Sequence, residues 1–197
     1  MILGIFYYLP SEKNVLAHNL LLVKISAPSL MLTYWVGEGY NNKKYGGKAM
    51  KKVLVAYVSR TGKTEKIAES IAEGIRISGN EAELRKISDI KSHEELAGYD
   101  GYVFGCPTYH RDMTAGMKTF LFLAEKANLL GKMGGAFGSY THSGESAPMI
   151  FDTMQFVFKM DMIDLGALNL KEAVVGTEDG LRAGQDYGKA VGEKFAN

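Results

Sequence analysis

The sequence predicts an α/β fold in which an open, five-stranded parallel sheet carries helices on both faces. Two features of residues 50–197 lead to this prediction. Short apolar runs of strand length alternate with longer segments that have a helical period. The first of these runs also lacks the polar alternation of a half-exposed strand, as expected when helices cover a strand on both sides. Such an alternation favours right-handed crossover connections within one sheet.

The first strand is expected at 53–58 (VLVAYV), and the first helix at 64–77, where apolar residues recur at helical spacing before Gly79. The segment 81–87 is expected to form an edge strand, and 101–105 a short buried strand. The remaining elements are expected to be a helix at 113–127, a strand at 132–137, a helix at 147–160, the last strand at 165–175 and a closing helix at 182–195.

Composition narrows the class of protein. Lys and Arg number 23 against 22 for Asp and Glu, a near balance that gives no electrostatic reason to expect a nucleic acid or an anionic membrane as partner. The single cysteine, Cys106, excludes an intramolecular disulfide and a cysteine-only metal site. We therefore expect no metal centre, an apolar role for Cys106, and a reducing cytoplasm as the location.

Residues 1–49 do not share the alternation, so the expected division is an N-terminal extension at 1–49 and one domain at 50–197. The apolar stretch 15–36 contains a lysine and a proline, which argues against a membrane-spanning helix. It also lacks the basic start and the small-residue cleavage site of a secretory signal. One hypothesis is that YGGKA, just before Met50, is a ribosome-binding sequence translated in frame, so that the native chain starts at Met50. The alternative is a poorly ordered extension.

The loop after the first strand, SRTGKT at 59–64, has the composition of a phosphate site. Ligands of such sheets bind beyond the carboxyl ends of the strands, where this loop lies. Three hydroxyls, a glycine and the free amides of a helix N-terminus can cradle a phosphate without a metal. The simpler interpretation is that the hydroxyls only cap the helix. A nucleotide-triphosphate loop is not expected, because Tyr57 stands where that loop needs a glycine. The predicted binding residues are Ser59, Arg60, Thr61, Gly62, Lys63 and Thr64.

This S-x-T-G-x-T loop, at the start of a five-stranded alternation, resembles the FMN-phosphate loop of flavodoxins. The resemblance extends over residues 51–195. It implies a flavodoxin-like fold with the strand order 2-1-3-4-5, and FMN as the cofactor.

The loop after the third strand, CPTYHRDM at 106–113, resembles the P-T-x-x-x-x-M segment that contacts the flavin ring in flavodoxin-like quinone reductases. A plain strand-to-helix turn with Asp112 as N-cap is compatible with the same residues. Arg111 departs from the family pattern, which has a small residue here, and a cation that points inward would favour the anionic reduced flavin. Pro107 stiffens the loop and Tyr109 offers an aromatic face. The predicted flavin contacts are Pro107, Thr108, Tyr109, His110, Arg111 and Met113.

The loop after the fourth strand, GSYTHSGE at 138–145, resembles the G-S-Y-x-x-S-G-E segment in the flavodoxin module of diiron flavoproteins. His142 stands where an aromatic residue is common in that segment, so stacking through its imidazole is expected to depend on pH. The alternative is that His142 is an ordinary exposed histidine and that Glu145 only begins a helix. The predicted flavin contacts in this loop are Ser139, Tyr140, Thr141, His142 and Gly144.

The resemblance implies an electron carrier, in which FMN takes electrons from a reductase or a ferredoxin-like donor and passes them to an unidentified acceptor. No catalytic side chain is expected for this function. The alternative is an NAD(P)H-dependent quinone or flavin reductase that uses the same FMN, and a third interpretation is a detached module that serves a diiron protein. The methionine- and phenylalanine-rich stretch 149–162 is expected to pack in the core, and its apolar excess also allows a homodimer.

Overall fold

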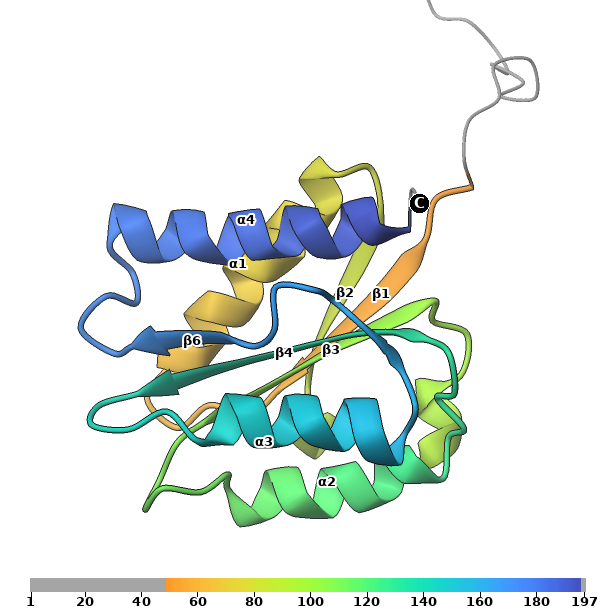
Figure 1. Ribbon diagram of the computed structural model, residues 1–197, viewed down its shortest axis with the longest axis horizontal. Coiled ribbons are helices and arrows are strands. Elements are labelled where there is room, and N and C mark those ends of the chain that lie inside the picture. Colours follow the sequence, from red (N-terminus) through yellow and green to blue (C-terminus); the bar gives the residue numbers. More distant parts are fainter. Residues whose placement is uncertain (1–48, 196–197) are drawn as a thin grey trace, which may run out of the picture. The chain divides into compact units, whose positions relative to one another are not determined.

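The computed structural model of the protein describes residues 49–195. Its middle layer is a parallel sheet with the strand order β2-β1-β3-β4-β5, which confirms the predicted fold class and order (Figure 1). The predictions for the N-terminal extension, including a native start at Met50, lie outside the described residues or at their margin and stay predictions. The strands are β1 (Lys52–Tyr57), β2 (Glu81–Lys86), β3 (Gly101–Pro107), β4 (Met133–Tyr140), β5 (Asp161–Met162) and β6 (Leu168–Lys171).

Helices cover both faces of the sheet. One face carries α1 (Lys63–Ile77) and α4 (Glu178–Lys194), and the other carries α2 (Ala115–Glu125) and α3 (Ser146–Asp152) (Figure 1). Successive residues of β1 contribute to different cores, because side chains of a strand alternate between its faces. Val53 and Val55 pack with α1, whereas Leu54 and Ala56 belong to the core under α2. In residues 49–195 no helix has both the length and the apolar character needed to cross a membrane.

The fifth strand position is divided, which corrects the predicted single strand at 165–175. β5 pairs with the start of β4, at Met133 and Gly134, and β6 pairs with its end, from Phe137 to Tyr140. The predicted range therefore began inside the break and ran past the end of β6. The sequence did not reveal the break, because an apolar run of strand length does not show where hydrogen bonding to the neighbouring strand stops.

A tyrosine hydroxyl bridges the break. The backbone N–H of Ala136 in β4 donates to the Tyr187 hydroxyl at 3.2 Å, and this hydroxyl donates to the Gly166 carbonyl at 2.8 Å. Tyr187 comes from α4 and is almost fully buried. Burial raises the pKa of Tyr187, so the phenol keeps its proton and can donate and accept at once.

The helices α1 and α4 approach until their backbones meet. A Cβ on Gly188 would lie 2.0 Å from the carbonyl oxygen of Ile71, and one on Gly74 would lie 2.0 Å from that of Gln185. Only glycine leaves room for this approach. The glycines of α4 at positions 180, 184, 188 and 192 recur every four residues and so lie on one side of the helix.

These glycines explain why the closing helix was predicted too short. α4 begins at Glu178 rather than at Arg182, and its N-cap Thr177 accepts a hydrogen bond from the Gly180 N–H at 3.3 Å. Glycine has a low helix propensity, so Gly180 and Gly184 weaken the helical pattern of the first turns. Packing against neighbouring backbone outweighs that preference in the folded chain.

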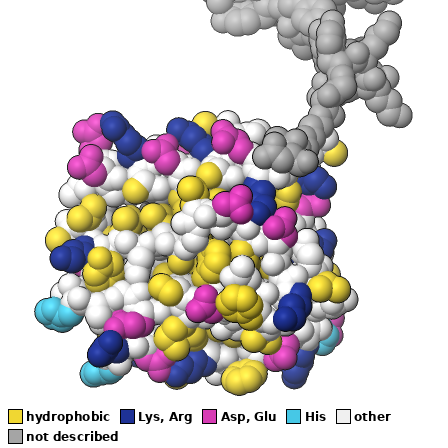
Figure 2. Space-filling model, in the orientation of Figure 1, with side chains coloured by type: hydrophobic (Ala, Val, Ile, Leu, Met, Phe, Trp, Pro, Cys, Tyr) yellow, Lys and Arg dark blue, Asp and Glu magenta, His cyan; other side chains and the backbone are white. Residues whose placement is uncertain are grey.

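The predicted helix at 147–160 is also divided. α3 ends at Asp152 and continues as a π-helical turn, Thr153–Val157, in which each turn contains more residues than in an α-helix. Phe156 and Val157 are exposed, and apolar side chains are visible over α2 and α3 in the lower half of Figure 2. The predicted core packing holds for Met154, Phe158, Met160 and Met162 but not for Met149 or Phe156.

Replacing Tyr187 with Phe keeps the ring and removes the hydroxyl from the strand break. We expect the free energy of unfolding to fall by about 1–3 kcal/mol, because a buried N–H and a partly buried carbonyl lose their partner. Urea denaturation followed by circular dichroism measures this loss. An unchanged midpoint would contradict the role given to the hydroxyl.

Gly188→Ala places a methyl group against the backbone of α1, and we expect it to destabilise the fold by about 1–3 kcal/mol. Gly116→Ala in α2 is the matched control. A Cβ there has only Ile87 Cδ1 within reach, at 3.9 Å, so the higher helix propensity of alanine leaves stability unchanged or slightly raised. Equal effects of the two substitutions on the urea midpoint would show that the helix contact does not need glycine.

Candidate functional site

Three strand-to-helix loops meet at the carboxyl end of the sheet. The first loop (58–62) joins β1 to α1, the second loop (108–114) joins β3 to α2, and the third loop (141–145) joins β4 to α3. The parallel register holds their starting points level, since Pro107 at the end of β3 pairs with Ser139 of β4. Both strands run further than predicted, so Pro107, Ser139 and Tyr140 lie in strands and not in loops.

The first loop presents a helix N-terminus that no side chain of the described residues caps. Gly62 is the N-cap of α1, with a φ of 81°, a left-handed conformation that glycine adopts without strain. The interpretation that the loop hydroxyls only cap the helix is therefore wrong. The exposed Thr61 and the free amides of the first turn are available to an anion.

Two other hydroxyls of the segment 59–64 point into the protein. The Ser59 Oγ is buried without a hydrogen-bond partner among the described residues. Thr64 Oγ1 and Ser139 Oγ, both buried, share a hydrogen bond of 2.9 Å, which ties the start of α1 to the end of β4. An unpaired buried hydroxyl costs about 1–3 kcal/mol, so Ser59 is a position where a bound group would restore a missing interaction.

The second loop is a tight turn in a strained conformation. Tyr109 and Asp112 exchange two backbone hydrogen bonds of 3.0 Å, and the two residues between them, His110 and Arg111, have φ of 51° and 61°. This is the geometry of a type I′ turn, which glycine and asparagine normally occupy. The left-handed conformation costs other residues about 1–2 kcal/mol each, so the surrounding structure must hold this turn in place.

The first and second loops touch through a cation–π contact. The guanidinium carbon of Arg60 lies 5.0 Å from the centroid of the Tyr109 ring. One face of Tyr109 is therefore already covered by a residue of the first loop. Arg60 was predicted to bind the phosphate and Tyr109 to contact the flavin ring, and the structure brings these two side chains together.

Asp112 is not the N-cap of α2, contrary to the alternative interpretation of this loop. The N-cap is Thr114, whose hydroxyl accepts from the Met117 N–H at 3.2 Å. Asp112 instead accepts from the Met113 N–H at 2.8 Å and pairs with Lys118, and this lysine lowers the pKa of the carboxyl group. The helix consequently begins at Ala115, two residues later than predicted.

A hydroxyl network joins the second loop to α3. The Ser146 Oγ donates to the Cys106 carbonyl at 2.9 Å and accepts from Thr108 Oγ1 at 2.9 Å, while the Ser146 N–H donates to Thr108 Oγ1 at 3.2 Å. Ser146 was not among the residues predicted from the sequence. Its position directly after the S-G-E motif is the sequence feature that could have marked it as part of the site.

The third loop is held from two sides. The Asn169 side-chain amide in β6 donates to the Gly144 carbonyl, and a Cβ on Gly144 would overlap that amide. Arg111 Nε donates to Glu145 Oε1 at 2.8 Å, and together with Ser143 the guanidinium holds the pKa of Glu145 below its usual value. Glu145 occupies the N-cap position of α3, although its carboxylate does not cap the helix.

The two histidines of the second and third loops lie at the surface. His142 is exposed, as its alternative interpretation expects, and so are Thr141 and His110. Whether these side chains contact a flavin stays a prediction, as it does for the other predicted binding residues. The structure brings all of the predicted binding residues to the carboxyl edge of the sheet.

Three side-chain oxygens in the described part of the chain are buried without a hydrogen-bond partner, and all belong to this edge. They are Ser59 Oγ, Glu145 Oε2 and Asn169 Oδ1. One can donate and all three can accept, which suits a ligand with several hydroxyl groups and a phosphate. The residues present therefore fit the ribityl phosphate of FMN. Within residues 49–195 no group of three His, Cys, Asp or Glu side chains is arranged to hold a metal ion.

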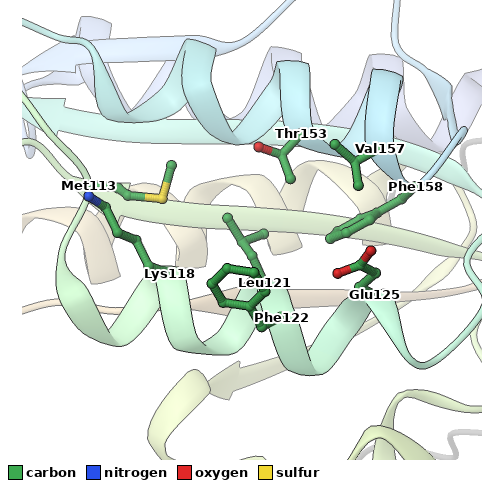
Figure 3. Close-up of a pocket in the computed structure, with 8 residues that line it drawn as sticks. All are labelled: Met113, Lys118, Leu121, Phe122, Glu125, Thr153, Val157 and Phe158. Carbon is green, nitrogen blue, oxygen red and sulfur yellow. The ribbon is translucent and has the colours of Figure 1, made fainter.

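A separate hollow of about 280 Å³ lies between α2 and the π-helical turn, away from this edge (Figure 3). Its lining is mainly apolar, and Met113 is the lining residue that the second loop contributes. No motif in the sequence predicted this hollow. The lining residues are Met113, Lys118, Leu121, Phe122, Glu125, Thr153, Val157 and Phe158.

Comparison with known proteins agrees with this geometry. The family model for flavodoxin matches residues 55–187. A flavodoxin from Clostridium saccharobutylicum is 37% identical over 89 residues, which cover 45% of this chain and 55% of the relative. This match therefore spans about half of that flavodoxin. An NAD(P)H dehydrogenase (quinone) from Acidithiobacillus ferrooxidans is 32% identical over 165 residues, covering 66% of this chain and 82% of the relative.

Solved structures share the fold. A flavodoxin from the domain Archaea superposes with a TM-score of 0.67 at 28% identity, covering 74% of this chain and 99% of the archaeal protein. The flavodiiron protein from Giardia intestinalis superposes with a TM-score of 0.66 at 24% identity, covering 74% of this chain and 36% of that protein.

Proposed function

Because the chain belongs to the flavodoxin family, whose cofactor is FMN, we propose that it binds FMN at the carboxyl edge of its sheet and transfers electrons between redox proteins. The observation that carries this proposal is that three oxygens, buried and unpartnered among the described residues, lie at the same edge of the sheet as an uncapped helix N-terminus. All of them lie in or beside the loops whose motifs resemble the flavin-binding loops of the family.

In this proposal the first loop holds the phosphate. The amides at the start of α1 donate to its oxygens, and the helix dipole favours its negative charge. The hydroxyls of Ser59 and Thr61 add hydrogen bonds, while Arg60 and Lys63 add positive charge from the same segment. Thr64 acts indirectly, by fixing α1 to Ser139.

The second and third loops receive the ring system. Tyr109 offers an aromatic face that Arg60 already orients. Pro107, Thr108 and Tyr140 provide backbone contacts at the ends of β3 and β4, and Gly144 provides one from the third loop. When bound, FMN supplies one- and two-electron transfer, and the protein sets its potential by burial, charge and hydrogen bonding. Asn169 and Glu145 present acceptor oxygens to the ligand in this arrangement.

The partners of this electron transfer are proposed to be a reductase or ferredoxin-like donor and an acceptor protein. A homodimer stays a prediction. The exposed apolar side chains that would support association are Phe122, Met149, Phe156 and Val157, on the helices beside the hollow of Figure 3. The role of a module serving a diiron protein also stays a prediction.

Ser59→Ala tests the site without disturbing the fold. We expect the ligand-free protein to be as stable as the wild type or slightly more stable, because the substitution removes an unpaired buried hydroxyl. FMN affinity should fall about tenfold or more, as for a lost hydrogen bond to a charged group. Quenching of flavin fluorescence during titration of the apoprotein measures the dissociation constant.

Ser78→Ala is the matched control for this test. Its hydroxyl already donates to the Ile75 carbonyl at 2.6 Å, at the opposite end of α1, so FMN affinity should not change. Equal FMN affinities of Ser59→Ala and the wild type would contradict the proposed phosphate site.

The second candidate function, an NAD(P)H-dependent quinone reductase, is favoured by the relative from Acidithiobacillus ferrooxidans. Steady-state oxidation of NADPH and NADH with a benzoquinone acceptor separates the two functions. A carrier should turn over slowly without a partner protein, with rates that do not saturate with the nicotinamide. Saturable oxidation at more than about one turnover per second, in the usual range of enzymes, would favour the reductase.

A further inference from the structure

One contact crosses the site between the second and third loops. Arg111 at the tip of the second loop and Glu145 at the start of α3 are 34 positions apart in the sequence, and Nε donates to Oε1 at 2.8 Å. The arginine side chain is 81% exposed, whereas that of the glutamate is 28% exposed. The pair therefore joins a surface side chain to a half-buried one.

The arginine belongs to a turn that needs support. His110 and Arg111 both have a left-handed backbone, and the two hydrogen bonds between Tyr109 and Asp112 act only within the turn. Through its ion pair with Glu145, Arg111 contacts the third loop. It acts on one of the two strained residues and fixes the direction in which the tip points.

The glutamate belongs to a segment that is already fixed. The residue before it, Gly144, accepts a hydrogen bond from Asn169, and the residue after it, Ser146, is bonded to Thr108 and Cys106. Glu145 is thus anchored on both sides. The more exposed half of the pair is the arginine, and the third loop is the support against which the second loop is held.

The same contact changes the electrostatics that Arg111 brings to the site. An Arg111 side chain that pointed inward would favour the anionic reduced flavin. In the structure a carboxylate oxygen lies 2.8 Å from Nε, so most of this charge is compensated locally. The other carboxylate oxygen, Oε2, is buried and has no hydrogen-bond partner among the described residues.

We propose that Arg111 and Glu145 are positioning residues that act as one neutral pair: they hold the second loop against the third, and they set the net charge beside the flavin ring. This proposal rests on the proposed function, because it assigns the pair a role toward FMN. Each partner has two effects, one on the affinity for the flavin and one on its reduction potential. Loss of either partner frees the charge of the other.

A double-mutant cycle tests the pair. FMN dissociation constants are measured for the wild-type apoprotein and for Arg111→Gln, Glu145→Gln and the double variant. We expect each single variant to bind about two- to fivefold more weakly, the size of effect measured for partly exposed ion pairs, and the double variant to be no weaker than the worse single one. Circular dichroism and thermal unfolding of each apoprotein check that the fold is retained.

Glu73→Gln is the control for the loss of a glutamate charge. Glu73 pairs with Arg76 at 3.8 Å on α1, nearer the opposite end of the helix from the first loop, and both side chains are about half exposed. The FMN affinity of Glu73→Gln should equal that of the wild type.

If the effects of Arg111→Gln and Glu145→Gln on FMN affinity simply add in the double variant, the two residues do not act as a pair, and the proposal is overturned.

The reduction potential of the FMN-loaded protein gives a readout that a purely structural role would not produce. Glu145→Gln leaves the arginine uncompensated and should raise the potential, whereas Arg111→Gln leaves the carboxylate uncompensated and should lower it. Shifts in the same direction, or none, would contradict the charge compensation. A wild-type protein without FMN affinity would overturn the proposed function itself, whereas additive effects in a protein that binds FMN overturn only the pair.

Discussion

Parallel pairing of β1, β3 and β4 is the constraint on which the rest of the structure depends. Because their registers are level, the chain leaves all three strands at the same edge, and residues far apart in sequence meet there. The central strands are buried on both faces, so a slip in register would move apolar side chains into the wrong core. The geometry of the candidate site is therefore a consequence of core packing.

The helices fix what the strands bring together. α1 is held to α4 by backbone contact at Gly74 and Gly188, and its N-terminus consequently has a defined direction at the first loop. α4 in turn supplies Tyr187, whose hydroxyl completes the hydrogen bonding of β4 where the fifth strand position is broken. Structural residues of α1 and α4 thus contribute to the position of the phosphate loop and of β4.

The sequence predicted the parts of the molecule that periodicity and local motifs encode. The apolar run of β1 and the helical period of α1 indicated the correct elements, and the three loops that carry the motifs lie at one edge of the sheet, as the predicted topology implied. Contacts between distant segments carry no such local pattern. The Tyr187 bridge, the Thr108 and Ser146 hydroxyls and the pairing of Arg111 with Glu145 depend on how the elements approach one another in space. The early start of α4 was missed because its glycines serve packing at the expense of helix propensity.

The central claim is that the first loop binds a phosphate as part of a flavin site. Comparison of FMN with riboflavin, which lacks the phosphate, tests this claim most directly by fluorescence titration of the same apoprotein. If the uncapped start of α1 and its hydroxyls bind the phosphate, FMN should bind at least about a hundredfold more tightly than riboflavin, as expected from two or more charge-assisted hydrogen bonds. Equal affinities for the two flavins, or no binding of either, would contradict the account.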